Sequence, residues 1–138
     1  MPMTIEMVRS ICRALPDTTE DIKWGHDLCF CIGGKMFAVV NLEARHSIAF
    51  KCTPETFGEL VERPGIIPAP YMARNMWVQE QELGEVLDRR ELELLIKASY
   101  ELVVARLPKS RQPKLKGEVA VRKRPRPKKT ASPRKRPR

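Results

Sequence analysis

The fold of this chain is decided by residues 28–42, which have the sequence LCFCIGGKMFAVVNL. The first part alternates large apolar residues with two cysteines, which is the period-two pattern of a β-strand. Gly33 and Gly34 follow, and paired glycines supply the positive φ angles of a tight hairpin turn. Residues 36–42 are apolar on both faces, as in a central strand that is covered on both sides. This stretch therefore predicts a β-hairpin at the centre of a sheet.

The residues before the hairpin predict a helix and a short strand. Apolar side chains recur every three or four positions over residues 4–14, which indicates an amphipathic helix. Thr4 is suited to cap the first turn of this helix, and Pro16 ends it. A short strand at residues 21–24 would then precede the hairpin.

The residues after the hairpin predict further strands around a second helix. A strand at residues 48–52 leads to Thr53-Pro54, where threonine can cap a helix and proline fits its first turn. Residues 66–74 contain two prolines and are predicted to form a loop. Another short strand is predicted at residues 75–79.

The last helix has the clearest boundaries. Asp88 caps it, Glu91 completes a variant of the capping box, and Pro108 ends it. Its buried face is predicted to carry Leu92, Leu95, Ile96, Ser99, Leu102 and Val103. The whole order is then α-β(3–4)-α-β-α, which favours an α+β fold of two layers with an antiparallel sheet against helices.

The charge of the chain divides it into two parts. Residues 1–107, the body, contain 12 Lys+Arg and 16 Asp+Glu. Residues 108–138, the basic tail, contain 14 Lys+Arg, one acid and six prolines. The tail has too few apolar side chains to offset the entropy cost of ordering, so we expect it to be disordered. The net charge is therefore negative for the body and positive for the tail, and the tail predicts a polyanionic partner.

The tail contains two short patterns typical of DNA-binding segments. KRPRPKK at residues 123–129 is similar to an AT-hook without its central glycine, and SPRK at 132–135 is similar to the repeats of histone H1-like tails. Both favour contacts with phosphate rather than the reading of a base sequence. The predicted nucleic-acid-binding residues of the tail are Arg122, Lys123, Arg124, Arg126, Lys128, Lys129, Arg134, Lys135, Arg136 and Arg138.

Some cations of the body could extend this binding track. Lys51, on the polar face of its strand, and Arg74, in a loop, are the candidates, with Lys35 and Arg45 as further strand-end or loop cations. The alternative interpretation is that these are ordinary solvated surface charges. The net negative charge of the body favours this alternative, because an acidic body repels phosphate unless its cations cluster.

Neither catalysis nor a cofactor is expected. His26 and His46 are the only histidines, and no nucleophile elbow, zinc-protease motif or phosphate loop is present. A zinc site formed by cysteines with these histidines would match no standard spacing, so we expect no metal and free thiols. Trp24 and Trp77 could stack on bases, but we favour burial in the core for both. For Tyr100 we expect a structural hydrogen bond.

Several short motifs of the body resemble those of one protein family. They are WGH at 24–26, GGKMFA at 33–38, KCTP at 51–54, PGIIPA at 64–69, Trp77, and SYELV at 99–103. Residues 3–107 resemble the MmcQ/YjbR family, apart from Asp27, where the family usually has proline, and Pro70-Tyr71. The resemblance implies a small α+β fold similar to CyaY and to type III secretion chaperones. It also implies DNA binding through exposed strands and loops.

We therefore expect a non-enzymatic DNA-binding protein whose tail binds the phosphate backbone of DNA or RNA without reading sequence. The alternative is a protein-interaction module, chaperone-like or dimerising, whose tail holds RNA or an acidic partner. A homodimer stays open. The chain has no apolar run long enough to cross a membrane and no signal-peptide pattern at its start, so we expect a cytoplasmic, nucleoid-associated protein.

Overall fold

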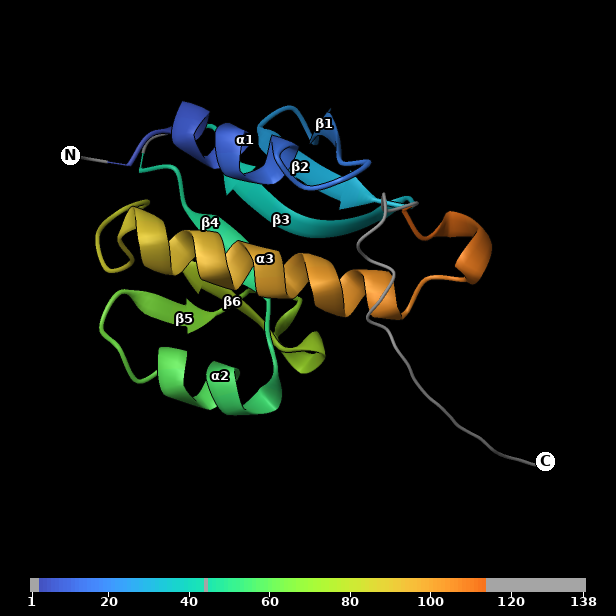
Figure 1. Ribbon diagram of the computed structural model, residues 1–138. Helices are drawn as coiled ribbons and strands as arrows, with labels where there is room; N and C mark the ends of the chain where they lie inside the picture. The colour runs from blue at the N-terminus through green and yellow to red at the C-terminus, as the bar shows by residue number, and fades with distance from the viewer. Residues whose placement is uncertain (1–2, 44, 114–138) are drawn as a thin grey trace.

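A computed structural model describes residues 3–43 and 45–113. These residues form three α-helices and a six-stranded antiparallel sheet (Figure 1). In chain order the elements are α1 (Ile5–Arg13), β1 (Thr19–Lys23), β2 (Asp27–Ile32), β3 (Lys35–Asn41), β4 (Ile48–Lys51), α2 (Pro54–Leu60), β5 (Ile66–Pro68), η1 (Ala73–Asn75), β6 (Trp77–Glu80), α3 (Arg89–Ala105) and η2 (Lys109–Arg111). The predicted α+β class is confirmed.

The strands lie in the order β1-β2-β3-β4-β6-β5, so the predicted hairpin of β2 and β3 is close to the centre of the sheet. The prediction of a loop over residues 66–74 is wrong at its start, where Ile66–Pro68 form β5. A proline is tolerated there because β5 is an edge strand that pairs on one side only, with β6.

The three helices cover one face of the sheet (Figure 1). α3 crosses its middle, with α1 beside it over β2 and α2 next to β5. The N-caps are those that the sequence predicts, because the side chains of Thr4, Thr53 and Asp88 accept backbone N–H groups of the first turns. The buried face of the sheet contributes large apolar side chains, among them Phe30 and Phe50, to a single core.

The opposite face, which we call the open face, carries no α-helix of the described residues. The strand register places Cys29, Val39, Ala49 and Gln79 side by side on it. The prediction that residues 36–42 are covered on both sides is therefore wrong. A small apolar cluster that includes Ala69 and Trp77 covers only part of this face.

The predicted disordered tail lies largely outside the described residues, which end at residue 113. Its first residues form η2, and the side-chain amide of Gln112 donates to the carbonyl oxygen of Leu107 at 3.0 Å. Among the described residues, no helix is long and apolar enough to cross a membrane.

Candidate functional site

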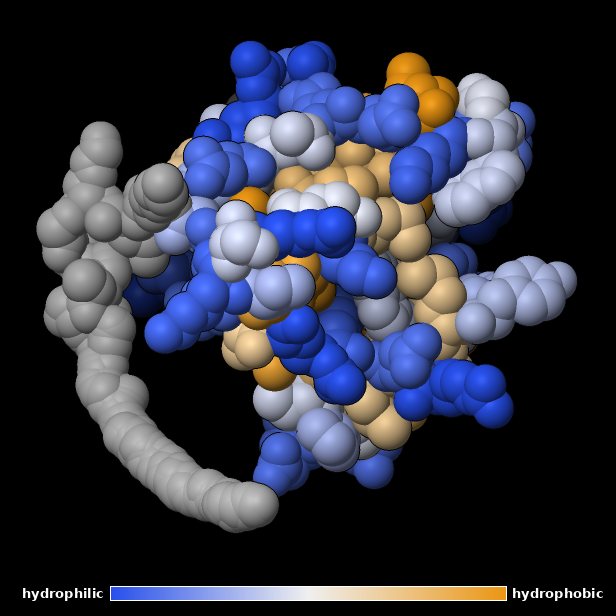
Figure 2. All heavy atoms as spheres, turned by 90° about the vertical axis from the view of Figure 1, so that its right-hand side faces the viewer, coloured by the Kyte–Doolittle hydropathy of each residue, from blue (hydrophilic) through white to orange (hydrophobic). Residues whose placement is uncertain are grey.

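The predicted nucleic-acid-binding cations of the tail all lie outside the described residues. The two predicted in the body, Lys51 at the end of β4 and Arg74 in η1, are described. Lys51 lies at the end of the molecule where α3 finishes, whereas Arg74 is exposed and lines none of the hollows described below. Figure 2 views this end and shows apolar side chains lying between strongly polar ones.

A hollow of about 520 Å³ at this end gathers three cations. Lys35, Lys51 and Arg106 line it, and no carboxylate of a described residue does so. Its other lining residues are Met36, Met72, Asn75, Trp77, Val103 and Leu107. We call it the cationic hollow. Because its positive charge is not neutralised locally, it attracts anions although the body as a whole is acidic.

Lys51 is fixed in this hollow rather than free in solvent. Its ammonium group donates to the carbonyl oxygen of Asn75 at 2.7 Å, and its backbone N–H donates to the hydroxyl of Ser99 at 3.0 Å. Partial burial lowers the pKa of Lys51, and the positive charge of Arg106 lowers it further. A bound anion would offset both effects, because it stabilises the charged form of Lys51.

The start of the tail is anchored beside the cationic hollow. Gly33, in the turn between β2 and β3, has a φ of 60°. A Cβ atom added to it would lie 2.7 Å from Leu107 Cδ1 and 3.2 Å from the carbonyl oxygen of Arg111. The turn before Lys35 therefore packs directly on η2, whose Lys109 and Arg111 are exposed. The first cations of the tail therefore follow a segment that is anchored beside the cationic hollow.

A second hollow of about 560 Å³ lies on the open face of the sheet. Its floor is apolar, with Met36, Val39, Ala49 and Met72. Its other lining residues are Trp24, Asp27, Asn41, Ser47, Ala69, Pro70, Tyr71 and Gln79. We call it the aromatic hollow. It shares Met36 and Met72 with the cationic hollow, so that the two form one depression.

The two tryptophans have opposite environments. Trp77 is 6% exposed, as the sequence predicts, whereas Trp24 is 67% exposed and the prediction of burial is wrong for it. Trp24 lies in the turn between β1 and β2 with a φ of 54°, which turns its ring away from the core. Tyr71 is fully exposed and also has a left-handed backbone, with a φ of 66°. Two exposed rings thus border one apolar hollow.

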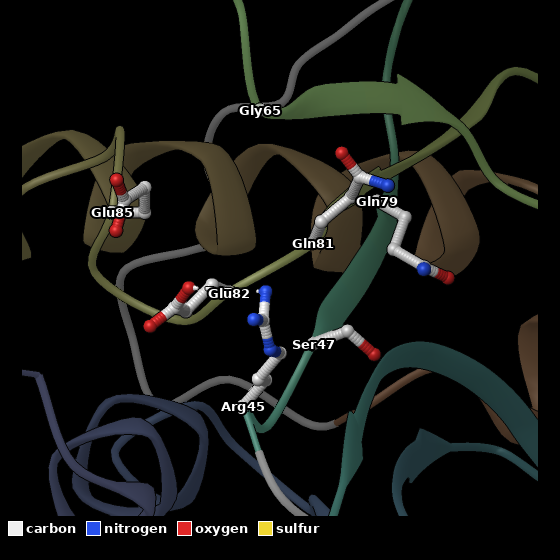
Figure 3. A pocket seen from close by; sticks show the side chains of 7 residues that line it. All are labelled: Arg45, Ser47, Gly65, Gln79, Gln81, Glu82 and Glu85. Carbon is white, nitrogen blue, oxygen red and sulfur yellow. Dashed lines mark ion pairs between the residues drawn. The ribbon is translucent and has the colours of Figure 1, made fainter.

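A third hollow, of about 410 Å³, continues the depression toward the opposite end of the sheet. It shares Ser47 and Gln79 with the aromatic hollow. Figure 3 shows Arg45 and Glu82 pointing toward one another in it, and their charged groups are 3.7 Å apart. Arg45, which the sequence suggests as a possible part of the track, is thus separated from the other cations and balanced by acids.

The histidines have local roles. His26 is partly exposed, with its Nε2 3.9 Å from a carboxylate oxygen of Asp27, and His46 Nδ1 lies 3.1 Å from the carbonyl oxygen of Asn41. The hydroxyl of Tyr100 donates to the carbonyl oxygen of Pro16 at 2.7 Å, so its predicted structural role is confirmed. Burial raises the pKa of Tyr100 to about 12.

The four cysteines are buried free thiols. Burial raises the pKa of Cys29 and of Cys52 to about 11 and raises that of Cys12 further. Neutral buried thiols are poor nucleophiles and poor metal ligands. Within residues 3–43 and 45–113, no group of three or more His, Cys, Asp or Glu side chains could hold a metal ion.

Sequence reasoning missed Arg106 and Tyr71. Arg106 is three residues after buried Val103, so the helical period that marks the buried face of α3 also directs Arg106 toward the sheet. Tyr71 follows two prolines in a stretch predicted as a loop, and no local pattern shows which way such a ring points. The buried carboxylate of Glu80, which accepts three backbone N–H groups of the turn before α3, was also missed because the strand was predicted to end at residue 79.

A family model described as YjbR matches residues 13–102. The chain belongs to the YjbR family. Among curated proteins, none matches the chain significantly.

Two solved structures share the YjbR fold of this chain. Protein DR2400 of Deinococcus radiodurans, with a domain described as DUF419, is 25% identical, with a TM-score of 0.72 over 83% of this chain and 93% of that one. A Pseudomonas syringae protein is 24% identical, with a TM-score of 0.60 over 72% of this chain and 98% of that one. The expected family is confirmed, and both solved structures have the fold of this chain.

Proposed function

We propose that this YjbR protein is a non-enzymatic nucleic-acid-binding protein. The basic tail supplies most of the affinity by contacting phosphates, and the cationic hollow extends that track onto the body. One observation carries the proposal. The tail, with 14 cations and one acid, begins beside the cationic hollow, where three cations line the surface and no carboxylate of a described residue does so. The site of action that it implies is the cytoplasm, at the nucleoid.

The physical basis is the release of counterions. Each phosphate that a cation neutralises contributes a slope of about 0.9 in log K against log salt for duplex DNA. A tail making six to ten such contacts would lose roughly 10³- to 10⁵-fold in affinity between 50 and 200 mM salt. Binding of this kind does not depend on base sequence.

The test compares the full chain with a variant in which the ten predicted tail residues from Arg122 to Arg138 are changed to glutamine. Duplex DNA of random sequence is titrated at several salt concentrations. We expect the variant to bind orders of magnitude more weakly, with a flatter salt dependence. Equal affinity and equal slope would show that the tail is not the binding element.

The contribution of the body is tested separately. Lys35→Gln/Arg106→Gln removes two exposed cations of the cationic hollow, and Arg89→Gln/Arg90→Gln removes two exposed cations at the other end of α3. The first pair should reduce affinity and lower the salt slope by about one to two units, and the second pair should change little. If both pairs of substitutions lowered the affinity equally, the body would contribute only through its net charge and not through the cationic hollow.

The alternative remains a protein-interaction module whose tail binds RNA or an acidic partner. The absorbance of the purified protein distinguishes the two functions. Nucleic acid that copurifies raises the ratio of absorbance at 260 nm to that at 280 nm, and nuclease with high salt lowers it again. A low ratio together with a stoichiometric protein partner would favour the module.

A further inference from the structure

The aromatic hollow of the open face adjoins the cationic hollow, which lies at the end of the sheet where α3 finishes. The aromatic hollow presents the exposed rings of Trp24 and Tyr71 above an apolar floor, and the cationic hollow presents Lys51 and Arg106. The two hollows meet at Met36 and Met72. A ligand that lies along this depression therefore meets flat apolar groups and positive charges in succession.

The rings of Trp24 and Tyr71 lie outside the core. Both belong to residues with a left-handed backbone, which side chains other than glycine and asparagine seldom adopt. Both are exposed although they border an apolar depression. Four other non-glycine residues in the described part of the chain also have a positive φ, so it is the exposure of two rings beside an apolar hollow that offers a surface to a flat ligand.

Asp27, Asn41, Ser47 and Gln79 supply the polar side chains of the aromatic hollow. The amide of Asn41 already donates to the carboxylate of Asp27 at 3.1 Å and accepts the backbone N–H of Glu43 at 2.9 Å. Ser47 and Gln79 can donate hydrogen bonds to the edge of a planar heterocycle and accept hydrogen bonds from it. The methionines beneath are flexible and polarizable, so they can adapt to planar groups of different size. The hollow thus suits an unpaired base better than it suits an aliphatic side chain.

We infer that the open face binds single-stranded nucleic acid, with bases against Trp24 and Tyr71 and the adjoining phosphates in the cationic hollow. The inference rests on the proposed function and adds a substrate class to it. Bases in a duplex are stacked on one another and cannot lie on a protein ring, whereas unpaired bases stack readily on aromatic side chains. The tail attracts any polyanion, and the open face selects the single strand.

The test uses the full chain and measures binding to a labelled oligothymidine of about 12 nucleotides and to a duplex of equal length at the same salt concentration. Trp24→Asn and Tyr71→Asn, alone and combined, remove the rings while asparagine tolerates the left-handed backbone. Leu94→Gln removes an exposed apolar side chain from α3 on the other side of the sheet and serves as the control.

Removing an aromatic ring on which a base stacks lowers the binding affinity roughly 5- to 100-fold per base. We expect a loss of this size for oligothymidine in each asparagine variant, little change for the duplex, and little change for Leu94→Gln with either ligand. Circular dichroism that matches the parent chain establishes that the variants are folded.

The outcomes separate this inference from the proposed function. Duplex binding that depends on the tail, together with oligothymidine binding that neither asparagine substitution weakens, overturns the inference alone and leaves the open face to a polypeptide. Loss of duplex affinity equal to the loss for oligothymidine also overturns it, because the rings would then not select unpaired bases. Failure of the tail variant to weaken duplex binding overturns the proposed function.

Discussion

The hydroxyl of Ser99 in α3 donates a 2.7 Å hydrogen bond to the carbonyl oxygen of Phe37 in β3. The same hydroxyl accepts the backbone N–H of Lys51 in β4 at 3.0 Å. Phe37 is the extra residue of a β-bulge, because Phe30 pairs with Ala38 while Cys31 pairs with Met36. Ser99 thus satisfies backbone groups of both strands where the ladder is irregular, and it holds Lys51 at the cationic hollow.

Replacing Ser99 should therefore destabilise the protein. Ser99→Ala leaves a buried carbonyl oxygen and an N–H group without this partner, at a cost of about 1–3 kcal/mol in the free energy of unfolding. Urea denaturation measures the change. Leu94→Ala, at an exposed position of the same helix, controls for helix propensity and should cost much less. An equal loss in both variants would show that Ser99 only fills space.

Glu80 is a second polar side chain on which the fold depends. It is fully buried, and its carboxylate accepts the backbone N–H groups of Gly84, Val86 and Leu87 at 3.1, 2.8 and 2.7 Å. It thereby shapes the turn that leads to α3.

Glu80→Gln keeps the size of the side chain but replaces one acceptor oxygen with a donor. Hydrogen bonds to a charged group contribute about 1.5–3 kcal/mol each, so the free energy of unfolding should fall by at least about 2 kcal/mol. Glu82→Gln, at an exposed position two residues later, is the matched control. A melting temperature that is the same for both variants would contradict the structural role of Glu80.

Much of this fold could be predicted because its signals are local. The double glycine at residues 33 and 34, the caps Thr4 and Asp88, and the alternation in β2 each depend on a few neighbouring residues. β5 was missed since three residues that end in a proline form a strand only because β6 is there to pair with them.

The site was less predictable because it depends on which face of the sheet the helices cover. The apolar residues of β3 give no sign that Met36 and Val39 border an open hollow rather than a second layer. The exposure of Trp24 follows from one backbone angle in a turn. The cationic hollow contains Lys35, Lys51 and Arg106, which come from segments distant in the sequence. No charge pattern along the chain predicts that they lie close together.

The buried ionisable groups predict how stability changes at alkaline pH. Burial raises the pKa of Cys29 and Cys52 to about 11 from an ordinary 9.0, and that of Tyr100 to about 12 from 10.0. A group with a raised folded-state pKa holds its proton more tightly when folded. Its contribution to stability is therefore complete below the ordinary pKa and is lost as pH rises through the folded-state value.

The free energy of unfolding should accordingly fall between about pH 9 and pH 12. Urea titrations at intervals of half a pH unit measure it, and a thiol reagent at pH 8 should label the native protein slowly and the urea-unfolded protein fast. Rapid labelling of the native protein at pH 8 would show that these thiols are accessible, contrary to their burial.

The last prediction concerns the contact that anchors the start of the tail. Gly33 and Gly34 both have positive φ, at 60° and 84°, but only Gly33 is crowded. A Cβ atom on Gly33 would lie 2.7 Å from Leu107 Cδ1, whereas one on Gly34 would meet nothing within 4 Å. The two positions therefore separate backbone strain from packing.

Gly34→Ala should cost about 1–2 kcal/mol from the left-handed backbone alone. Gly33→Ala should cost more, because Leu107 and η2 must also move, and it should weaken nucleic-acid binding if η2 positions Lys109 and Arg111 beside the cationic hollow. The measurements are urea denaturation and duplex binding in the full chain. Equal stability and equal affinity of the two alanine variants would show that η2 does not pack on the turn in solution.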